Sequence, residues 1–191
     1  GFIGVVPDRI RQLASDPAAD APGGSKVVEF VLPSAAKTPA LVTNWAQFVR
    51  RFGDFTGDPA AAAVAESRRQ PAPVDDGHRR LAHAVYGFFD NGGSRCFVVR
   101  ITDVGELDAA LAALATIDEI ALVCAPGMTD AVTRDKLVAH CAATGDRFAI
   151  LDGPPAAPEL DALTKTGENG LAPKRSDLAA WYFPWIDVFD P

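Results

Sequence analysis

The sequence contains no run of about 18 apolar residues and no signal-peptide pattern, so direct insertion into a membrane is not expected. Basic residues are also scarce, since 18 Lys and Arg stand against 25 Asp and Glu and leave a formal net charge of −7. Nonspecific nucleic-acid binding relies on Lys and Arg to displace phosphate counterions. This charge balance therefore argues against a nucleic-acid partner.

Cysteine is rare as well: only Cys96, Cys124 and Cys141 occur, an odd number with no close spacing. All three fall in apolar segments, which predicts reduced, buried thiols and synthesis in a reducing compartment. No cysteine pair has the spacing of metal ligands, and His78 and His83 are five residues apart and do not share a helix face. We therefore expect no metal and no other cofactor.

What the sequence does contain is the pattern of an α/β protein, with 48% hydrophobic residues to build a core. From residue 78 to 152 it reads strand-helix-strand-helix-strand after a first helix, which favours a parallel-type sheet. Additional strands are expected near the N-terminus, together with a strand segment near the C-terminus. The expected strands are Phe2–Val6, Val27–Leu32, Cys96–Ile101, Ile120–Cys124, Arg147–Leu151 and a return to the core at Ala179–Trp185.

The chain is expected to form one domain in three parts. Residues 1–53 hold the N-terminal strands and a helix that starts at Thr43 or Asn44 and ends at Gly53; residues 11–25 read as a surface loop. Residues 54–77 read as a surface insertion, and residues 78–191 as the α/β core with its closing strands. Because both ends of the sequence are apolar, we expect a piece of a longer polypeptide.

The most informative segment is residues 81–101, LAHAVYGFFDNGGSRCFVVRI. Its apolar residues fall on one helix face, the sequence Asn91-Gly92-Gly93 ends that helix, and the run from Cys96 to Ile101 is typical of a strand covered on both faces. At least one of the two glycines is expected to need a positive φ.

A phosphate-binding loop is disfavoured at Asn91–Gly93, because these residues follow a helix and precede a strand. The loops 125–129 and 152–156 do follow strands, where α/β proteins bind ligands, but neither carries a phosphate-binding motif. Asp130 would moreover repel a phosphate from the helix that Thr129 is expected to cap.

A catalytic cysteine is also disfavoured. Cys124 ends a strand, but His140 and Cys141 are adjacent on a helix and point about 100° apart, so they cannot form a dyad with each other. Asp152 could orient His140 only if the helix folded back over it, and a turn residue is the simpler interpretation. We therefore assign no catalytic, cofactor-binding or metal-binding residue.

Two further groups of residues are interpreted as structural. The arginine pairs at 50–51, 68–69 and 79–80 read as solvated or intersubunit charges. The aromatic residues between Trp181 and Trp185 read as core and interface, because no basic groove accompanies them as a nucleic-acid stacking platform would require.

Five segments together resemble contractile tail sheath proteins of phage tails and related bacterial injection particles. They occur in the family's order and are spread over residues 41 to 189; residues 1–40 match more loosely. The segments are 41–53 (LVTNWAQFVRRFG), 81–101, 124–128 (CAPGM), 140–152 (HCAATGDRFAILD) and 179–186 (AAWYFPWI).

The resemblance implies a structural protein with no active site. Such a subunit assembles helically with its own copies around an inner tube protein, between baseplate and cap proteins, and contracts to drive the tube forward. It would assemble in the bacterial cytoplasm and act in a phage tail or a released particle. The family's N-terminal arm and C-terminal domain, which link subunits, have no counterpart in this sequence. The alternative is a small cytoplasmic α/β enzyme or ligand-binding domain that uses loops 125–129 and 152–156.

Overall fold

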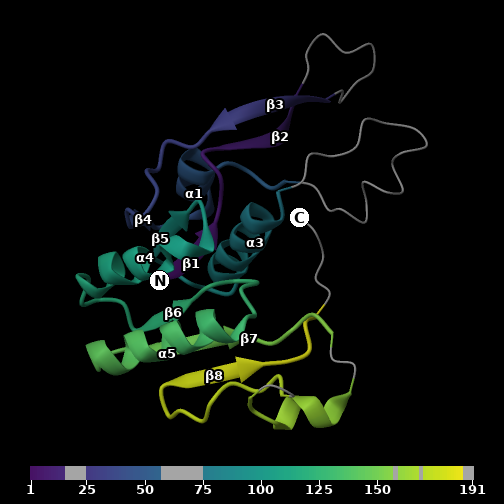
Figure 1. The fold of residues 1–191 in the computed structure, drawn as a ribbon. Helices are drawn as coiled ribbons and strands as arrows, with labels where there is room; N and C mark the ends of the chain where they lie inside the picture. Colours follow the sequence, from purple (N-terminus) through teal and green to yellow (C-terminus); the bar gives the residue numbers. More distant parts are fainter. Residues whose placement is uncertain (16–24, 57–74, 157–158, 168–169, 187–191) are drawn as a thin grey trace.

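The computed structural model describes residues 1–15, 25–56, 75–156, 159–167 and 170–186. Its centre is a six-stranded sheet in the order β4-β5-β1-β6-β7-β8, drawn in Figure 1. The strands are β1 (Phe2–Val5), β4 (Ala40–Val42), β5 (Cys96–Ile101), β6 (Leu122–Cys124), β7 (Phe148–Asp152) and β8 (Ala179–Tyr182). Only β4 runs antiparallel to its neighbour, so the predicted α/β class with a mostly parallel sheet is confirmed.

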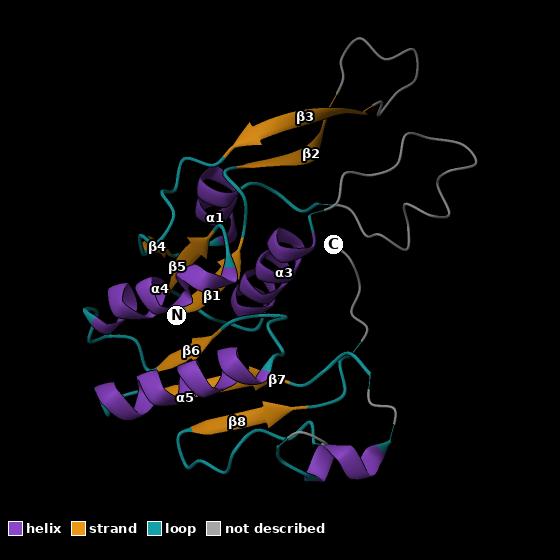
Figure 2. Cartoon of the chain, viewed as in Figure 1, coloured by secondary structure: helices purple, strands orange, loops and turns teal. Residues whose placement is uncertain are grey.

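Helices cover both faces of the sheet, as Figure 2 shows. On one face, α3 (Asp76–Asp90) packs over β1 and β5 beside α1 (Trp45–Phe52). On the other face lie α4 (Leu107–Ala115), which follows the 3-10 turn η1 (Val104–Glu106), and α5 (Ala131–Thr144). A second 3-10 turn, η2 (Leu160–Thr164), precedes β8.

The close packing of α3 on β1 depends on two glycines. A Cβ atom at Gly4 would lie 2.7 Å from Cδ2 of Leu81, and one at Gly77 would overlap the carbonyl oxygen of Val5. Leu81 and Val85 are fully buried as a result. The first strand of the chain therefore lies in the middle of the sheet, between β5 and β6.

The segment 81–101 folds as its sequence predicts. α3 ends at Asp90, Asn91 is its C-cap, and Gly92 adopts the positive φ of 91° that the turn requires. β5 is covered on both faces, because Val98 and Val99 point to opposite sides and are both fully buried. α1 also agrees with its prediction: Asn44 caps it, and Gly53 ends it.

Three predictions need correction. The expected loop 11–25 begins instead with a strand, because β2 (Arg9–Ser15) pairs antiparallel with β3 (Ser25–Val31) in a separate two-stranded hairpin; residues 16–24 lie outside the described residues. α3 starts at Asp76, inside the expected insertion 54–77, of which residues 57–74 are not described.

The third correction concerns the expected buried strand Ile120–Cys124. The observed β6 is three residues long, and Leu122 is 51% exposed. An apolar run alone cannot show whether both faces of a strand are covered, because that depends on where the connecting helices pack.

Candidate functional site

The two loops that sequence reasoning singled out meet at the carboxyl ends of the parallel strands. The backbone N–H of Gly127 donates a hydrogen bond of 2.7 Å to Oδ2 of Asp152. Gly127 has a positive φ of 77°, which favours glycine at this turn. A cavity of about 340 Å³ lies beside the first of these loops, 125–129, and is lined by Val5, Arg80 and Met128 among others.

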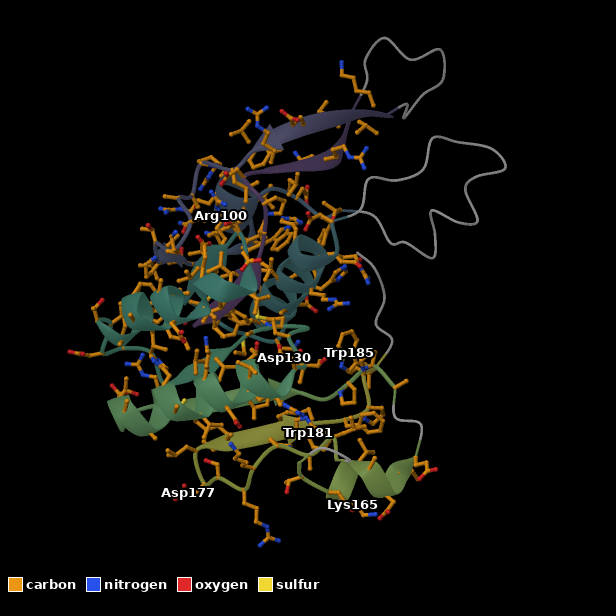
Figure 3. All side chains as sticks on the ribbon, viewed as in Figure 1. Arg100, Asp130, Lys165, Asp177, Trp181 and Trp185 are labelled. Atoms are coloured by element: carbon orange, nitrogen blue, oxygen red, sulfur yellow. The ribbon has the colours of Figure 1, made fainter. Side chains whose placement is uncertain are left out.

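Arg80 is half-buried at this edge and contacts its own chain, so of the two alternatives for the pair 79–80, solvated or intersubunit charges, the solvated one is wrong for Arg80 and the intersubunit one stays a prediction. Nη1 of Arg80 donates to the carbonyl oxygen of Gly127 at 3.1 Å, and its guanidinium carbon lies 5.3 Å from the ring centroid of Trp185. Nε1 of Trp185 donates in turn to the carbonyl oxygen of Gly153 at 2.8 Å. Figure 3 labels Trp185 beyond the end of β8. Arg80 and Trp185 thus hold the chain after β8 against the loops after β6 and β7.

Asp130, not Thr129, caps α5, since its carboxylate accepts a hydrogen bond of 2.9 Å from the N–H of Thr133. Partial burial raises the pKa of Asp130, but the hydrogen bonds from Thr133 outweigh it and the net pKa is lowered. A carboxylate that stays ionised here opposes the binding of a phosphate at this helix terminus.

The residues considered for a catalytic cysteine site, Cys124, His140 and Asp152, do not form a catalytic arrangement. In the described part of the chain, no hydrogen bond joins Cys124, His140 and Asp152. Nε2 of His140 lies 3.3 Å from Nη1 of Arg147 instead, and burial followed by the charge of Arg147 lowers the pKa of His140. Burial raises the pKa of the Cys124 thiol to about 12, which leaves almost no thiolate at neutral pH.

The two histidines near the start of α3 lie in separate environments. His78 is buried, and its Nε2 lies 2.8 Å from the carbonyl oxygen of Phe52. The ring centroid of His83 lies 4.9 Å from the ring centroid of Phe55. No group of three or more His, Cys, Asp or Glu side chains within the described residues could hold a metal ion.

Two buried arginines join distant segments, and sequence reasoning did not single them out. Arg100 donates to the carbonyl oxygen of Ser34 at 2.6 Å and to Asp8 at 2.6 Å. Arg147 donates to the carbonyl oxygen of Leu114 at 3.0 Å, at the end of α4. The sequence signal that could have identified Arg100 is its position inside the apolar strand β5, because a buried cation requires partners.

The surface that sequence reasoning missed is one face of β6, β7 and β8. Residues on the opposite face, such as Val123 and Leu151, are buried under α5, whereas this face lies beyond the edge of α3. We call it the open face; by the register of the strands it comprises Leu122, Cys124, Phe148, Ile150, Asp152, Ala180 and Tyr182. Leu122 is 51% and Tyr182 61% exposed.

A cavity of about 460 Å³ runs along the open face. Leu122, Cys124, Ile150 and Asp152 line it on the sheet side, and Ala84 and Phe88 of α3 line it on the helix side. Apolar side chains dominate this lining. Exposed apolar surface of this kind marks contact sites on proteins.

Comparison with known proteins gives no family assignment. No protein-family model matches the chain, and no curated protein matches its sequence. Within the described residues, no helix combines the length and the apolar character that crossing a membrane requires.

Proposed function

We propose that this chain is the body of a contractile sheath subunit. Its copies would assemble helically around an inner tube, between baseplate and cap proteins, and contract to drive the tube forward. Assembly would take place in the bacterial cytoplasm, and the particle would act as a phage tail or after release. The basis of the proposal is the resemblance of five segments in the family's order.

One structural observation supports this proposal: the sheath-like segments are engaged in fixing the fold. Gly127 of the segment 124–128 donates to Asp152 of the segment 140–152. Arg147 of that second segment binds the end of α4. Residues that define a family through its fold, rather than through a reaction, are expected to make contacts of this kind.

A rigid body suits a protein that works by rearrangement. Contraction requires bodies that move as units and contacts between them that have two alternative arrangements. The six-stranded sheet, with cores on both faces, supplies such a unit. Its exposed surfaces then become the parts that change partners.

Negative-stain electron microscopy of the full-length protein, expressed with its neighbouring genes, tests the proposal. We expect tubes with regular striations, in a long narrow and a short wide form. Small particles of uniform size at every protein concentration would contradict it.

A second candidate, a ligand-binding domain at loops 125–129 and 152–156, has one observation in its favour. The two loops meet at the carboxyl edge of the sheet, where α/β proteins bind ligands, and loop 125–129 lines the 340 Å³ cavity. A thermal-shift screen of nucleotides and small metabolites would test it. A saturable rise in Tm that Arg80→Ala abolishes would support this candidate, and no rise would remove it.

A further inference from the structure

The open face lacks the cover that a parallel sheet normally has. Parallel strands are usually packed on both faces, and β1 and β5 follow this rule. On β6, β7 and β8, α5 covers one face, whereas within the described residues the other face meets only the edge of α3, across the 460 Å³ cavity. The exposed side chains of Leu122 and Tyr182 therefore point to a contact with a partner.

A second apolar surface lies on the β2–β3 hairpin. Its inner face carries Ile10, which is 2% exposed, and Phe30, and it packs against the core around α1. The opposite face, which we call the outer hairpin face, carries Arg9, Arg11, Val27, Glu29 and Val31. Val31 is 57% and Val27 37% exposed. Two-stranded sheets are marginally stable alone, so cover on this face would stabilise the hairpin.

We infer that the outer hairpin face of one subunit packs on the open face of the next subunit. This inference rests on the proposed function, because assembly supplies the second copy. It specifies a contact within the lattice that the family resemblance does not assign to any residue of this chain.

The two surfaces agree in size and in type. Val27 and Val31 are four residues apart on β3, a span of about 13 Å at the usual rise of a strand. Leu122 pairs with Phe148, and Asp152 follows Phe148 by four residues, so the open face has about the same length. Two sheet faces of this kind can pack on each other as the layers of a sandwich do.

The charges of the two surfaces are complementary. Arg9 is paired with Glu29 at 2.6 Å, whereas Arg11 forms no ion pair within the described residues. On the open face, Asp152 uses one carboxylate oxygen for the N–H of Gly127. The outer hairpin face thus carries the cation Arg11, and the open face carries the anion Asp152, each beside exposed apolar side chains.

The position of the two surfaces determines the kind of assembly. The hairpin lies at one end of the molecule beyond α1, and β6, β7 and β8, which carry the open face, lie at the opposite end, as Figure 1 shows. Contact between two different patches is heterologous, and repeated heterologous contact gives rings or open helical filaments. A helical sheath requires a contact of this type.

Cysteine cross-linking of the full-length protein tests the contact. We would combine Val31→Cys with Leu122→Cys in a Cys124→Ala background, because Cys124 lies on the open face beside the introduced thiol. Under mild oxidation of assembled protein, the double variant should form a ladder of covalent multimers. Each single variant should form none.

The matched control pairs Leu122→Cys with Val132→Cys on α5, where Val132 is 64% exposed. This position is as accessible as Val31 but lies outside the proposed contact, so no ladder is expected. A ladder of equal yield in the control pair would overturn the inference.

The remaining outcomes separate the two proposals. If the full-length protein forms striated tubes but the double variant gives no ladder, the proposed function stands and this inference fails. If the protein forms no polymer under any condition, both fail. If Leu122→Cys resists thiol reagents in the depolymerised subunit, another segment of the same chain covers the open face, and the inference again fails.

Discussion

The two halves of the sheet differ in how they are covered. In the half formed by β5 and β1, adjacent residues such as Val98 and Val99 point to opposite faces and are both 0% exposed. In the half formed by β6, β7 and β8, Val123 is 0% exposed but its neighbour Leu122 is 51% exposed. Apolar residues in the first half stabilise the fold. Leu122 on the open face contributes little to it and is available for contact.

The connections between the strands explain this difference. The helix before β5 is α3, which packs on one face over β1 and β5. The helices that lead to β6 and β7, α4 and α5, both pack on the other face. One face of β6 and β7 therefore receives no helix from its own connections.

The largest expected effect compares two leucines across this divide. Leu81→Ala would leave a cavity between α3 and β1 and should cost about 2–5 kcal/mol in the free energy of unfolding. Leu122→Ala removes a side chain that is already half exposed and should cost less than about 1 kcal/mol. Urea denaturation of both variants measures the difference. Similar losses would show that the open face belongs to the core of the isolated chain.

The next effect concerns the turn that leads into the covered half. Gly92 has a φ of 91°, and a Cβ atom added there would meet no other atom within 4 Å. Gly92→Val should therefore cost about 1–2 kcal/mol from backbone strain alone. Gly87→Ala is the matched control, because Gly87 also faces open space but lies inside α3; it should stabilise the protein by up to about 1 kcal/mol. Unchanged stability of Gly92→Val in urea denaturation would mean that the helix ends elsewhere.

A smaller effect is expected from pH. Burial lowers the pKa of His78 from its ordinary value of 6.5, against the opposing influence of the Phe52 carbonyl and of Asp75. Because the unfolded chain then binds the proton more readily than the folded chain, the contribution of His78 to the free energy of unfolding is fully present above about pH 6.5. It decreases as the pH falls below that value. His78→Gln should weaken this dependence.

Unfolding midpoints in urea between about pH 7.5 and 5 provide the measurement. Part of the slope should remain in His78→Gln, because the pKa of His140 is lowered as well. An equal slope in the two proteins would show that His78 does not titrate on unfolding.

The smallest expected effect is a difference in the rate of alkylation between two thiols, one in each half of the sheet. Burial raises the pKa of Cys96 to about 11 and that of Cys124 to about 12, so neither should be a fast nucleophile near neutral pH. Cys124 on the open face should nevertheless be alkylated before Cys96, which lies beneath α3. Mass spectrometry of partly alkylated protein gives the order. Earlier reaction of Cys96 would mean that α3 leaves the sheet more readily than the packing indicates.

The site was less predictable than the fold. The loops at 125–129 and 152–156 were identified because strands end there, and they do meet. The partnership of Arg80 with Trp185 could not be read from the sequence, because 104 positions separate residues that touch only after β8 has joined the sheet. The pairing of β2 with β3 was missed for a different reason, since prolines and glycines between the strands favoured a loop.

Elements whose signals are local were predictable from the sequence. The helix face from Leu81 to Phe89, the stop at Asn91–Gly92 and the apolar run of β5 depend on neighbours within a few residues, so the types of these elements, the end of α3 and the limits of β5 were predicted. The tertiary structure alone decided which apolar faces are covered. Whether Leu122 is buried depends on which side of the sheet α4 and α5 pack. That side depends on the arrangement of the whole sheet, in which β1 lies between β5 and β6.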